Sequence, residues 1–205
     1  GGPQRIAEIE PRPQVLLTEG SSLAWLSRSA EGEFTLHALR DGQPRRIYDS
    51  PGRIDAATLA DGAAYFIERP EGTQWRVGRT SLGGGEARYA PLKRGRTPPM
   101  LTAGRRGLYY YEGAKLRVRR LSFDLQVEET YAEDCVCSPM AVAEDVYCAR
   151  VEGLFAVSEG GVSKELTKND PGGFVAAIAA SPSRLVWVTD AGNNRLQVEL
   201  LRLRD

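Results

Sequence analysis

The sequence predicts an all-β fold in which short antiparallel sheets repeat along the chain. Five apolar runs, each holding one aromatic residue, lie 40, 44, 38 and 40 residues apart. The chain is rich in turn-forming residues, with 22 Gly and 12 Pro among 205 residues. No window keeps apolar residues at helical spacing over three turns, which argues against an α/β fold.

The repeat length predicts what the sheets build. A period near forty with β-type runs is typical of a four-stranded propeller blade. We therefore predict a five-bladed β-propeller of four-stranded blades as a single domain over residues 1–205, with a six-bladed or incomplete propeller as the alternative. The aromatic anchors are Trp25, Tyr65, Tyr109, Tyr147 and Trp187. The blades are expected at about 14–50, 53–93, 97–132, 137–168 and 173–205.

Each repeat divides into the same strands, with the anchor on the second strand. The first strands are small and apolar: Val15–Thr18, Ile54–Leu59, Met100–Ala103, Met140–Ala143 and Val175–Ala180. The third strands are Phe34–Arg40, Trp75–Leu82, Lys115–Phe123, Leu154–Ser158 and Arg195–Leu203. The fourth strands are more polar: Arg45–Tyr48, Glu86–Leu92, Gln126–Tyr131 and Val162–Leu166. Turns such as Asp61-Gly62 separate the strands, because Gly and Asp tolerate positive φ.

The fifth repeat lacks a fourth strand, since the sequence ends at Asp205. Residues 4–10, before the first repeat, alternate apolar and polar side chains. An open sheet edge is a liability, so a ring needs its two ends joined. We predict that Arg5–Ile9 supplies the outer strand of the last blade.

Composition and charge restrict the function. The formal net charge is zero, which argues against nucleic-acid binding driven by the charge of the whole protein. The longest apolar run, Phe174–Ala180, has seven residues and is too short to cross a bilayer. A targeting segment is expected to lie outside this sequence.

The three cysteines, Cys135, Cys137 and Cys148, fall within 14 positions. Two of them could pair across a local hairpin, and we expect one disulfide that includes Cys148, as in an oxidising compartment. The alternative is small buried thiols. A zinc site is not expected, because the one histidine, His37, is distant in the sequence.

The third repeat carries an unusual basic stretch. Nine Lys or Arg residues lie between Lys93 and Arg120 against one acid, Glu112, and an acidic stretch with Glu128 and Glu129 follows. The alternation at 115, 117 and 119 indicates one face of a strand. Those basic side chains could pair across strands with the acids, or they could bind an anionic glycan or an acidic protein surface. The candidate binding residues are Arg94, Arg96, Arg105, Arg106, Lys115, Arg117 and Arg119.

No catalytic residue, cofactor site or metal site is assigned. His37 alternates with apolar residues on a predicted third strand, and the sequence shows no partner for it as a base. The acids at the turns after the first strands are Glu19, Asp61, Glu144 and Asp145. A pair among them would support the alternative function, a carbohydrate-active enzyme with carboxylates at the channel or rim.

Residues 186–198, VWVTDAGNNRLQV, resemble the NHL repeat, with an apolar-aromatic strand, Asp, Gly-Asn-x-Arg and a second apolar strand. Residues 81–85 and 137–143 are similar to segments of YWTD-like and TolB-like propellers of the bacterial cell envelope. The resemblance implies a non-catalytic ligand- or protein-binding sensor module, the ectodomain of a larger protein that is periplasmic, secreted or at the cell surface. Lyases of the NHL group need several metal-binding histidines, and this chain has one.

Overall fold

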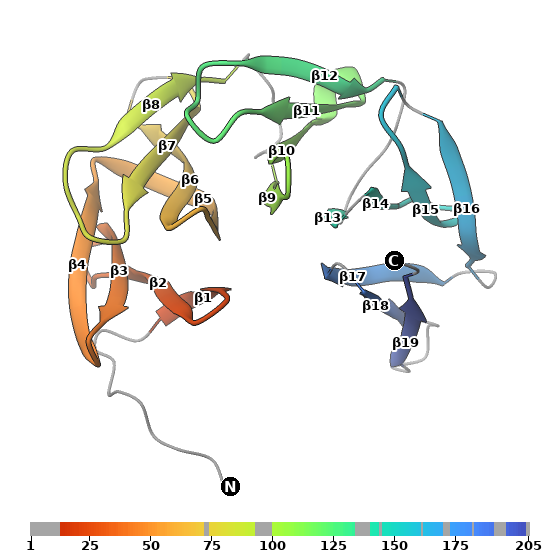
Figure 1. The fold of residues 1–205 in the computed structure, drawn as a ribbon, viewed down its shortest axis with the longest axis horizontal. Helices are drawn as coiled ribbons and strands as arrows, with labels where there is room; N and C mark the ends of the chain where they lie inside the picture. The colour runs from red at the N-terminus through yellow and green to blue at the C-terminus, as the bar shows by residue number, and fades with distance from the viewer. Residues whose placement is uncertain are drawn as a thin grey trace, which may run out of the picture. The chain divides into compact units, whose positions relative to one another are not determined.

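The computed structural model describes residues 13–71, 74–92, 100–133, 140–143, 145–160, 162–169, 173–181, 183–190 and 196–203. These residues form nineteen β-strands and one short 3₁₀ helix, as the sequence pattern predicted for an all-β chain (Figure 1). The chain divides into two compact units, Gly1–Arg94 and Gly95–Asp205, and each is described by itself. The predicted strand at 4–10 lies outside the described residues.

The first unit holds two four-stranded antiparallel sheets, each a meander of consecutive strands. The first sheet comprises β1 (Pro13–Glu19), β2 (Ser22–Arg28), β3 (Phe34–Arg40) and β4 (Gln43–Ser50). The second comprises β5 (Gly52–Ala60), β6 (Ala63–Pro70), β7 (Arg76–Ser81) and β8 (Arg88–Pro91).

Two-residue Asp-Gly turns close two of these hairpins. Asp41-Gly42 joins β3 to β4, Asp61-Gly62 joins β5 to β6, and all four residues have φ between 49° and 74°. A type I′ turn needs positive φ at both central residues, and Asp-Gly is among its preferred pairs. The turn at Asp61-Gly62 is where the sequence predicted it.

Apolar side chains from both sheets form the core of the first unit. In β3 every second residue is buried, which points Phe34, Leu36 and Ala38 at the second sheet. They pack in one cluster with Ile54 and Phe66 of the second sheet. Full burial of one such large side chain stabilises the fold by about 1.5–3 kcal/mol.

A buried charge also joins the two sheets. The Glu68 carboxylate on β6 is fully buried and accepts hydrogen bonds from Tyr48 Oη at 2.7 Å and from Ser50 Oγ, both on β4. Arg76 Nε on β7 donates to its other oxygen at 2.7 Å. The Arg76 guanidinium lies 3.7 Å from the ring centroid of Tyr89, whose hydroxyl donates to Tyr48 at 2.9 Å. Every oxygen of this buried acid therefore has a donor.

The second unit holds two four-stranded sheets and one three-stranded sheet. The first contains β9 (Leu101–Gly104), β10 (Gly107–Glu112), β11 (Arg117–Leu121) and β12 (Glu128–Ala132), with the 3₁₀ helix η1 (Gly113–Lys115) between β10 and β11. The next contains β13 (Met140–Val142), β14 (Val146–Ala149), β15 (Gly153–Val157) and β16 (Ser163–Lys168). The last contains β17 (Phe174–Ser181), β18 (Arg184–Asp190) and β19 (Leu196–Arg202).

Two apolar clusters hold these three sheets together. Tyr109 and Val118 pack against Met140 and Val146 in the first cluster. The second cluster joins the middle sheet to the last one. Its buried members are Ala143, Tyr147, Ala149, Leu154, Val175, Leu185 and Trp187.

The five aromatic anchors occupy equivalent places. Each lies on the second strand of its sheet, and none is more than 7% exposed. The strands that carry them are β2, β6, β10, β14 and β18. The repeat alignment drawn from the sequence is therefore confirmed at the level of single strands.

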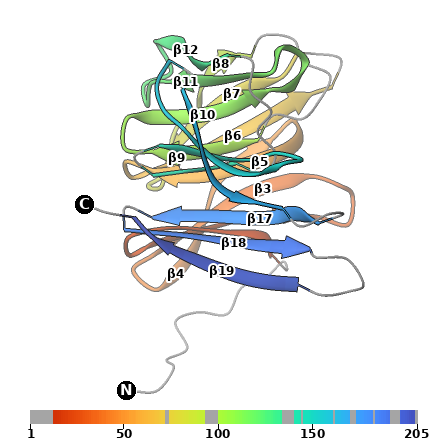
Figure 2. The same cartoon turned by 90° about the vertical axis from the view of Figure 1, so that its right-hand side faces the viewer.

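Strand β19 forms one edge of the three-stranded sheet (Figure 2). It pairs with β18 along its whole length, and no described strand pairs with its other side. Leu196, Val198 and Leu200 are 66%, 71% and 55% exposed. The fifth repeat thus has three strands, as predicted.

Candidate ligand-binding site

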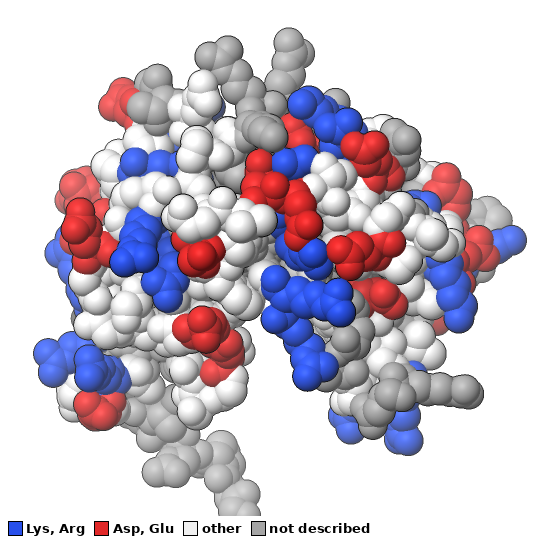
Figure 3. Space-filling view, turned by 45° about the horizontal axis from the view of Figure 1, so that its top comes forward, with Lys and Arg blue, Asp and Glu red and all other residues white. Residues whose placement is uncertain are grey.

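The basic residues of the third repeat that the structure describes all have partners, and most of them form ion pairs with acids. Arg106 lies 3.3 Å from Glu159, Arg117 lies 3.1 Å from Glu133, and Arg120 contacts both Glu129 and Glu159. Arg105 lies in the turn before β10 and is also engaged. Arg94 and Arg96 lie outside the described residues. Blue basic groups lie beside red acidic groups on the face shown in Figure 3.

Arg119 is the most deeply placed of these cations. Its side chain is 8% exposed, and Nη2 lies 3.0 Å from Glu128 Oε2 on the neighbouring strand β12. Burial lowers the pKa of Arg119, but the hydrogen bond and charge of Glu128 outweigh burial and raise it. Tyr110 also donates to Glu128, and burial together with that bond raises the pKa of Tyr110. Cross-strand pairing, one of the two interpretations of this stretch, is what the geometry shows for Arg119 and Arg120.

One detail of the predicted basic face is wrong. Lys115 belongs to η1 and not to a strand, so it does not continue the alternation of Arg117 and Arg119 on β11. Leu116, the residue after η1, has φ of 51°, and this left-handed residue separates Lys115 from the strand. Lys115 instead lies 3.6 Å from the buried carboxylate of Glu112.

Of the acids at the turns, Glu19 has a structural role. Glu19 accepts hydrogen bonds from the backbone N–H of Asp61 at 2.8 Å and of Gly62 at 3.4 Å, and so holds the β5–β6 turn. Asp145 is half-buried beside the start of β14, and Glu144 lies outside the described residues. Over the described ranges no group of three or more His, Cys, Asp or Glu side chains could hold a metal ion.

The remaining sequence candidates fall on the second and third strands. His37 stacks on Trp25 with ring centroids 5.2 Å apart, and its Nε2 lies 2.9 Å from Ser27 Oγ. Cys148 on β14 is fully buried and disulfide-bonded, whereas Cys135 and Cys137 lie outside the described residues. Of the NHL-like turn, Asp190 ends β18 and residues 191–195 are outside the described residues.

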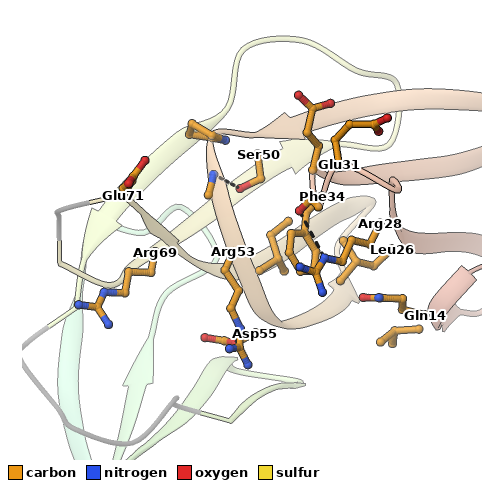
Figure 4. Close-up of a pocket in the computed structure, with 16 residues that line it drawn as sticks. Gln14, Leu26, Arg28, Glu31, Phe34, Ser50, Arg53, Asp55, Arg69 and Glu71 are labelled. Atoms are coloured by element: carbon orange, nitrogen blue, oxygen red, sulfur yellow. Dashed lines mark hydrogen bonds and ion pairs between the residues drawn. The ribbon is translucent and has the colours of Figure 1, made fainter.

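The first unit contains a hollow of about 830 Å³ that the sequence analysis did not predict (Figure 4). It opens where β2, β4 and β6 end and β5 begins, so the loops at one end of both sheets surround it. The apolar side chains of Leu26, Phe34 and Ile54 line it. The charged residues around it are Arg28, Glu31, Glu33, Arg53, Asp55, Arg69 and Glu71.

Local hydrogen bonds fix the loops around the hollow. Ser29 N–H donates to Glu33 O at 2.8 Å and Gly32 N–H donates to Ser29 O at 3.1 Å, which closes the β2–β3 loop. Gly52 packs so closely on β6 that a Cβ there would lie 2.3 Å from Arg69 O. A glycine is therefore required at the entry to β5, where the wall of the hollow begins.

Asp55 is the unusual group in this wall. The pairing of β5 with β6 shifts between Ile54 and Ala56, so Asp55 is the extra residue of a β-bulge. Bulges redirect side chains, and they are frequent next to binding sites. The Asp55 side chain is 4% exposed, and Oδ1 pairs with Arg53 Nε. Its Oδ2 is buried without a hydrogen-bond partner among the described residues. Such an oxygen is costly to bury unless something donates to it.

The arginines of the hollow already have contacts. The Arg28 guanidinium lies 5.2 Å from the Phe34 ring centroid and donates to Gly32 O at 3.4 Å. Arg53 pairs with Asp55, and Arg69 lies 5.7 Å from the Trp75 ring centroid. Among the described residues of this wall, the Asp55 Oδ2 atom is the buried acceptor without a hydrogen-bond partner.

Sequence reasoning missed this site although a signal was present. The predicted first strand Ile54–Leu59 holds one acid among apolar and small residues. A carboxylate inside such a strand needs a partner or a bulge. The sequence does not show the register shift that turns Asp55 into the hollow.

Comparisons with known proteins identify the fold. No protein-family model and no curated protein matches this chain. Among solved structures, a streptogramin B lyase is 13% identical, with a TM-score of 0.58 over 94% of this chain and 84% of the lyase. A protein from Agrobacterium tumefaciens described as TolB is 13% identical, with a TM-score of 0.60 over 87% of this chain and 76% of that protein.

A PQQ-bound aldose sugar dehydrogenase from Streptomyces coelicolor is 13% identical, with a TM-score of 0.53 over 94% of this chain and 78% of the enzyme. All three are β-propeller proteins. The likeness supports a β-propeller fold. At these identities the similarity concerns the fold alone, since enzymes and other proteins share this propeller architecture.

Within the described ranges, no helix of this propeller is long and apolar enough to cross a membrane.

Proposed function

We propose that this propeller is a non-catalytic binding module that holds a small polar ligand in the hollow of the first unit. One observation carries the proposal: Asp55 lies in the wall with a buried carboxylate oxygen that has no hydrogen-bond partner among the described residues. The volume of about 830 Å³ lies within the range of small-molecule sites. Charged side chains outnumber the apolar ones in its lining, which suits a polar ligand.

The alternative, a carbohydrate-active enzyme, gains little from the geometry. Glycoside hydrolysis uses two carboxyl groups about 5–10 Å apart across the bond that is cleaved. Glu19 is bound to the backbone of the β5–β6 turn, and Asp55 is paired with Arg53. Each of these carboxylates therefore already binds a group of the protein.

A fragment screen on the full chain tests the proposed function. We expect polar fragments to shift the NMR resonances of backbone amides around the hollow, such as Gly32 and Gly52, and to leave those of β13–β16 unchanged. Asp55→Asn should weaken the binding of these fragments. Asp41→Asn, at an exposed turn of the first sheet, should leave their binding unchanged. The proposal fails if no fragment perturbs the hollow, or if both variants behave alike.

We further propose that the module works outside the cytoplasm, as an ectodomain of the NHL and YWTD-like kind. The disulfide-bonded state of Cys148 supports this location, because disulfides persist in oxidising compartments. We expect Cys135 or Cys137 to be its partner. Peptide mapping without reduction should recover a peptide that contains Cys148 linked to one of those cysteines.

At the level of the fold, we propose five blades and closure of the last one by Arg5–Ile9. The three-stranded last sheet and the exposed apolar side chains of β19 support this proposal. An added strand would satisfy the outer backbone groups of β19 and cover part of its apolar surface.

A further inference from the structure

We infer that the hollow of the first unit selects an organic cation, an alkylguanidinium or alkylammonium group that donates to Asp55 Oδ2. The inference rests on the proposed function and gives its ligand a chemical class. A carboxylate is an acceptor with no proton to donate when ionised, so the missing partner of Oδ2 must be a donor. A positively charged donor makes the strongest such bond.

The other charges around the hollow also favour a positively charged ligand. Four acids and three arginines line it, and contacts within the protein already engage the arginines. Glu33 and Glu71 are exposed at the rim, where they add negative potential above the buried Asp55. An anionic ligand would instead be repelled by the unpaired carboxylate oxygen of Asp55.

The lining offers the rest of the ligand little free apolar surface. Leu26 and Ile54 border the hollow but are almost fully buried, and the Phe34 ring already carries the Arg28 guanidinium on its face. The charged end of the ligand is therefore the part that this hollow recognises, through Asp55. Figure 4 shows Arg53 and Asp55 together in the wall, between Arg69 on one side and Arg28 on the other.

A matched series of probes tests whether the ligand must carry a positive charge. Butylguanidinium, butylammonium, butanol and butyrate share an alkyl chain and differ in the polar end. We expect both cations to bind the full chain and to shift the amide resonances of Gly32 and Gly52, with butanol much weaker and butyrate inactive. If butanol or butyrate binds the hollow as well as the cations do, the inference fails and the proposed function stands. If no probe and no fragment binds, both fail.

Two variants locate the interaction. Asp55→Asn should lower the affinity for the cations by about tenfold or more, because a charged hydrogen bond is lost. Arg53→Met should raise that affinity, because it removes a competing cation from Asp55. The same change would lower the affinity for an anionic ligand. Arg53 is 71% exposed, so this variant is expected to fold. Cation binding that is unchanged in Asp55→Asn, or weakened in Arg53→Met, would overturn the inference.

The source of the cation is settled by a second pair of probes. A free amine and an arginine side chain of a partner protein share the same chemistry. Agmatine represents the free metabolite, and a short peptide with one central arginine represents the partner. Tighter binding of the peptide assigns the site to a protein ligand, tighter binding of agmatine assigns it to a small molecule, and binding of neither contradicts the inference.

Discussion

Glu68 shows how a single buried charge joins two blades of the first unit. Its carboxylate is reached by donors from β4 and β7, and the donors are themselves ordered by Tyr89. Burial raises the pKa of Tyr48, and the bonds to Tyr89 and Glu68 raise it further, so Tyr48 remains a donor at all ordinary pH values. Burial strengthens the attraction between Glu68 and Arg76. Removal of either partner would leave the other charge without its counter-charge.

Replacing Glu68 by Gln should therefore lower the free energy of unfolding by about 3 kcal/mol, because Arg76 loses its counter-charge. Urea unfolding of the wild type and the variant measures this difference. Glu71→Gln changes an exposed acid close by in the sequence and should shift stability by less than about 0.5 kcal/mol. Equal effects of the two changes would show that the Glu68 network adds nothing to stability.

His37 gives the fold a dependence on pH. Burial lowers the pKa of His37 below its ordinary value of 6.5, the charge of Arg46 lowers it further, and Asp49 opposes them. The unfolded chain therefore binds the proton more tightly than the folded chain. The stability that neutral His37 contributes is present above about pH 6.5 and is lost as the pH falls from there through the folded pKa.

Because His37 is the one histidine in the chain, this effect can be isolated. NMR titration should give a folded pKa below 6.5, and the free energy of unfolding should fall between about pH 7.5 and about pH 5.5. The fall should be smaller in His37→Asn. A folded pKa at or above 6.5, or the same fall in the variant, would contradict the assignment.

At this scale the sequence predicted some contacts and missed others for a physical reason. Pairing of Arg119 with Glu128 was one of the two interpretations that strand alternation and opposite charge allowed, whereas the pair of Arg120 with Glu129 was not predicted. The place of Asp55 was not predicted either, because a bulge changes which side a residue faces without changing the residue pattern. Long-range contacts such as Glu68 with Tyr48 also depend on how two sheets pack, which no local pattern contains.

Strands and turns were the most predictable elements. The turn at Asp61-Gly62 has a sequence preference strong enough to fix its conformation. The aromatic anchors located each second strand, because a large apolar side chain on a central strand is buried in every blade. The helix η1 was not predicted, since Gly-Ala-Lys carries no helix signal over three residues.

The pairing of β11 with β12 makes a prediction about the basic stretch. Arg119→Glu places a carboxylate near Glu128 in a buried position and should destabilise the fold by about 3 kcal/mol or more. Arg117→Glu alters a partly exposed pair with Glu133 and should cost about 1 kcal/mol or less. Thermal unfolding of both variants measures the contrast.

The Arg117→Glu variant also tests the anionic-partner hypothesis. If this surface binds anions, Arg117→Glu should lose retention on anionic glycans while its stability is kept. Equal retention of wild type and Arg117→Glu would leave the basic stretch with its structural role alone.

For the whole molecule, the forty-residue period was sufficient to predict sheets, their order and the short last repeat. It was not sufficient to fix the number of blades or the partner of β19, because these depend on how the two ends of the chain meet. Repeat architectures make each unit predictable from its neighbour. The two ends of a propeller are joined at one place, so no repeated sequence pattern can indicate how they are joined.

Deletion of residues 1–10 tests the proposed closure. If Arg5–Ile9 pairs with β19, the deletion should lower the melting temperature by several degrees or more, because it removes strand hydrogen bonds and exposes apolar surface. Deletion of Gly1 and Gly2 alone should have no effect. An unchanged melting temperature in the longer deletion would refute the closing strand.

The exposed apolar side chains of β19 also affect how readily the protein associates with itself. A long edge strand with leucine and valine side chains in water is a template onto which another chain can add. A shortened chain that leaves this strand bare should therefore form soluble oligomers or fibrils as its concentration rises, even where each blade remains folded. The first ten residues would then act as a built-in guard against self-association.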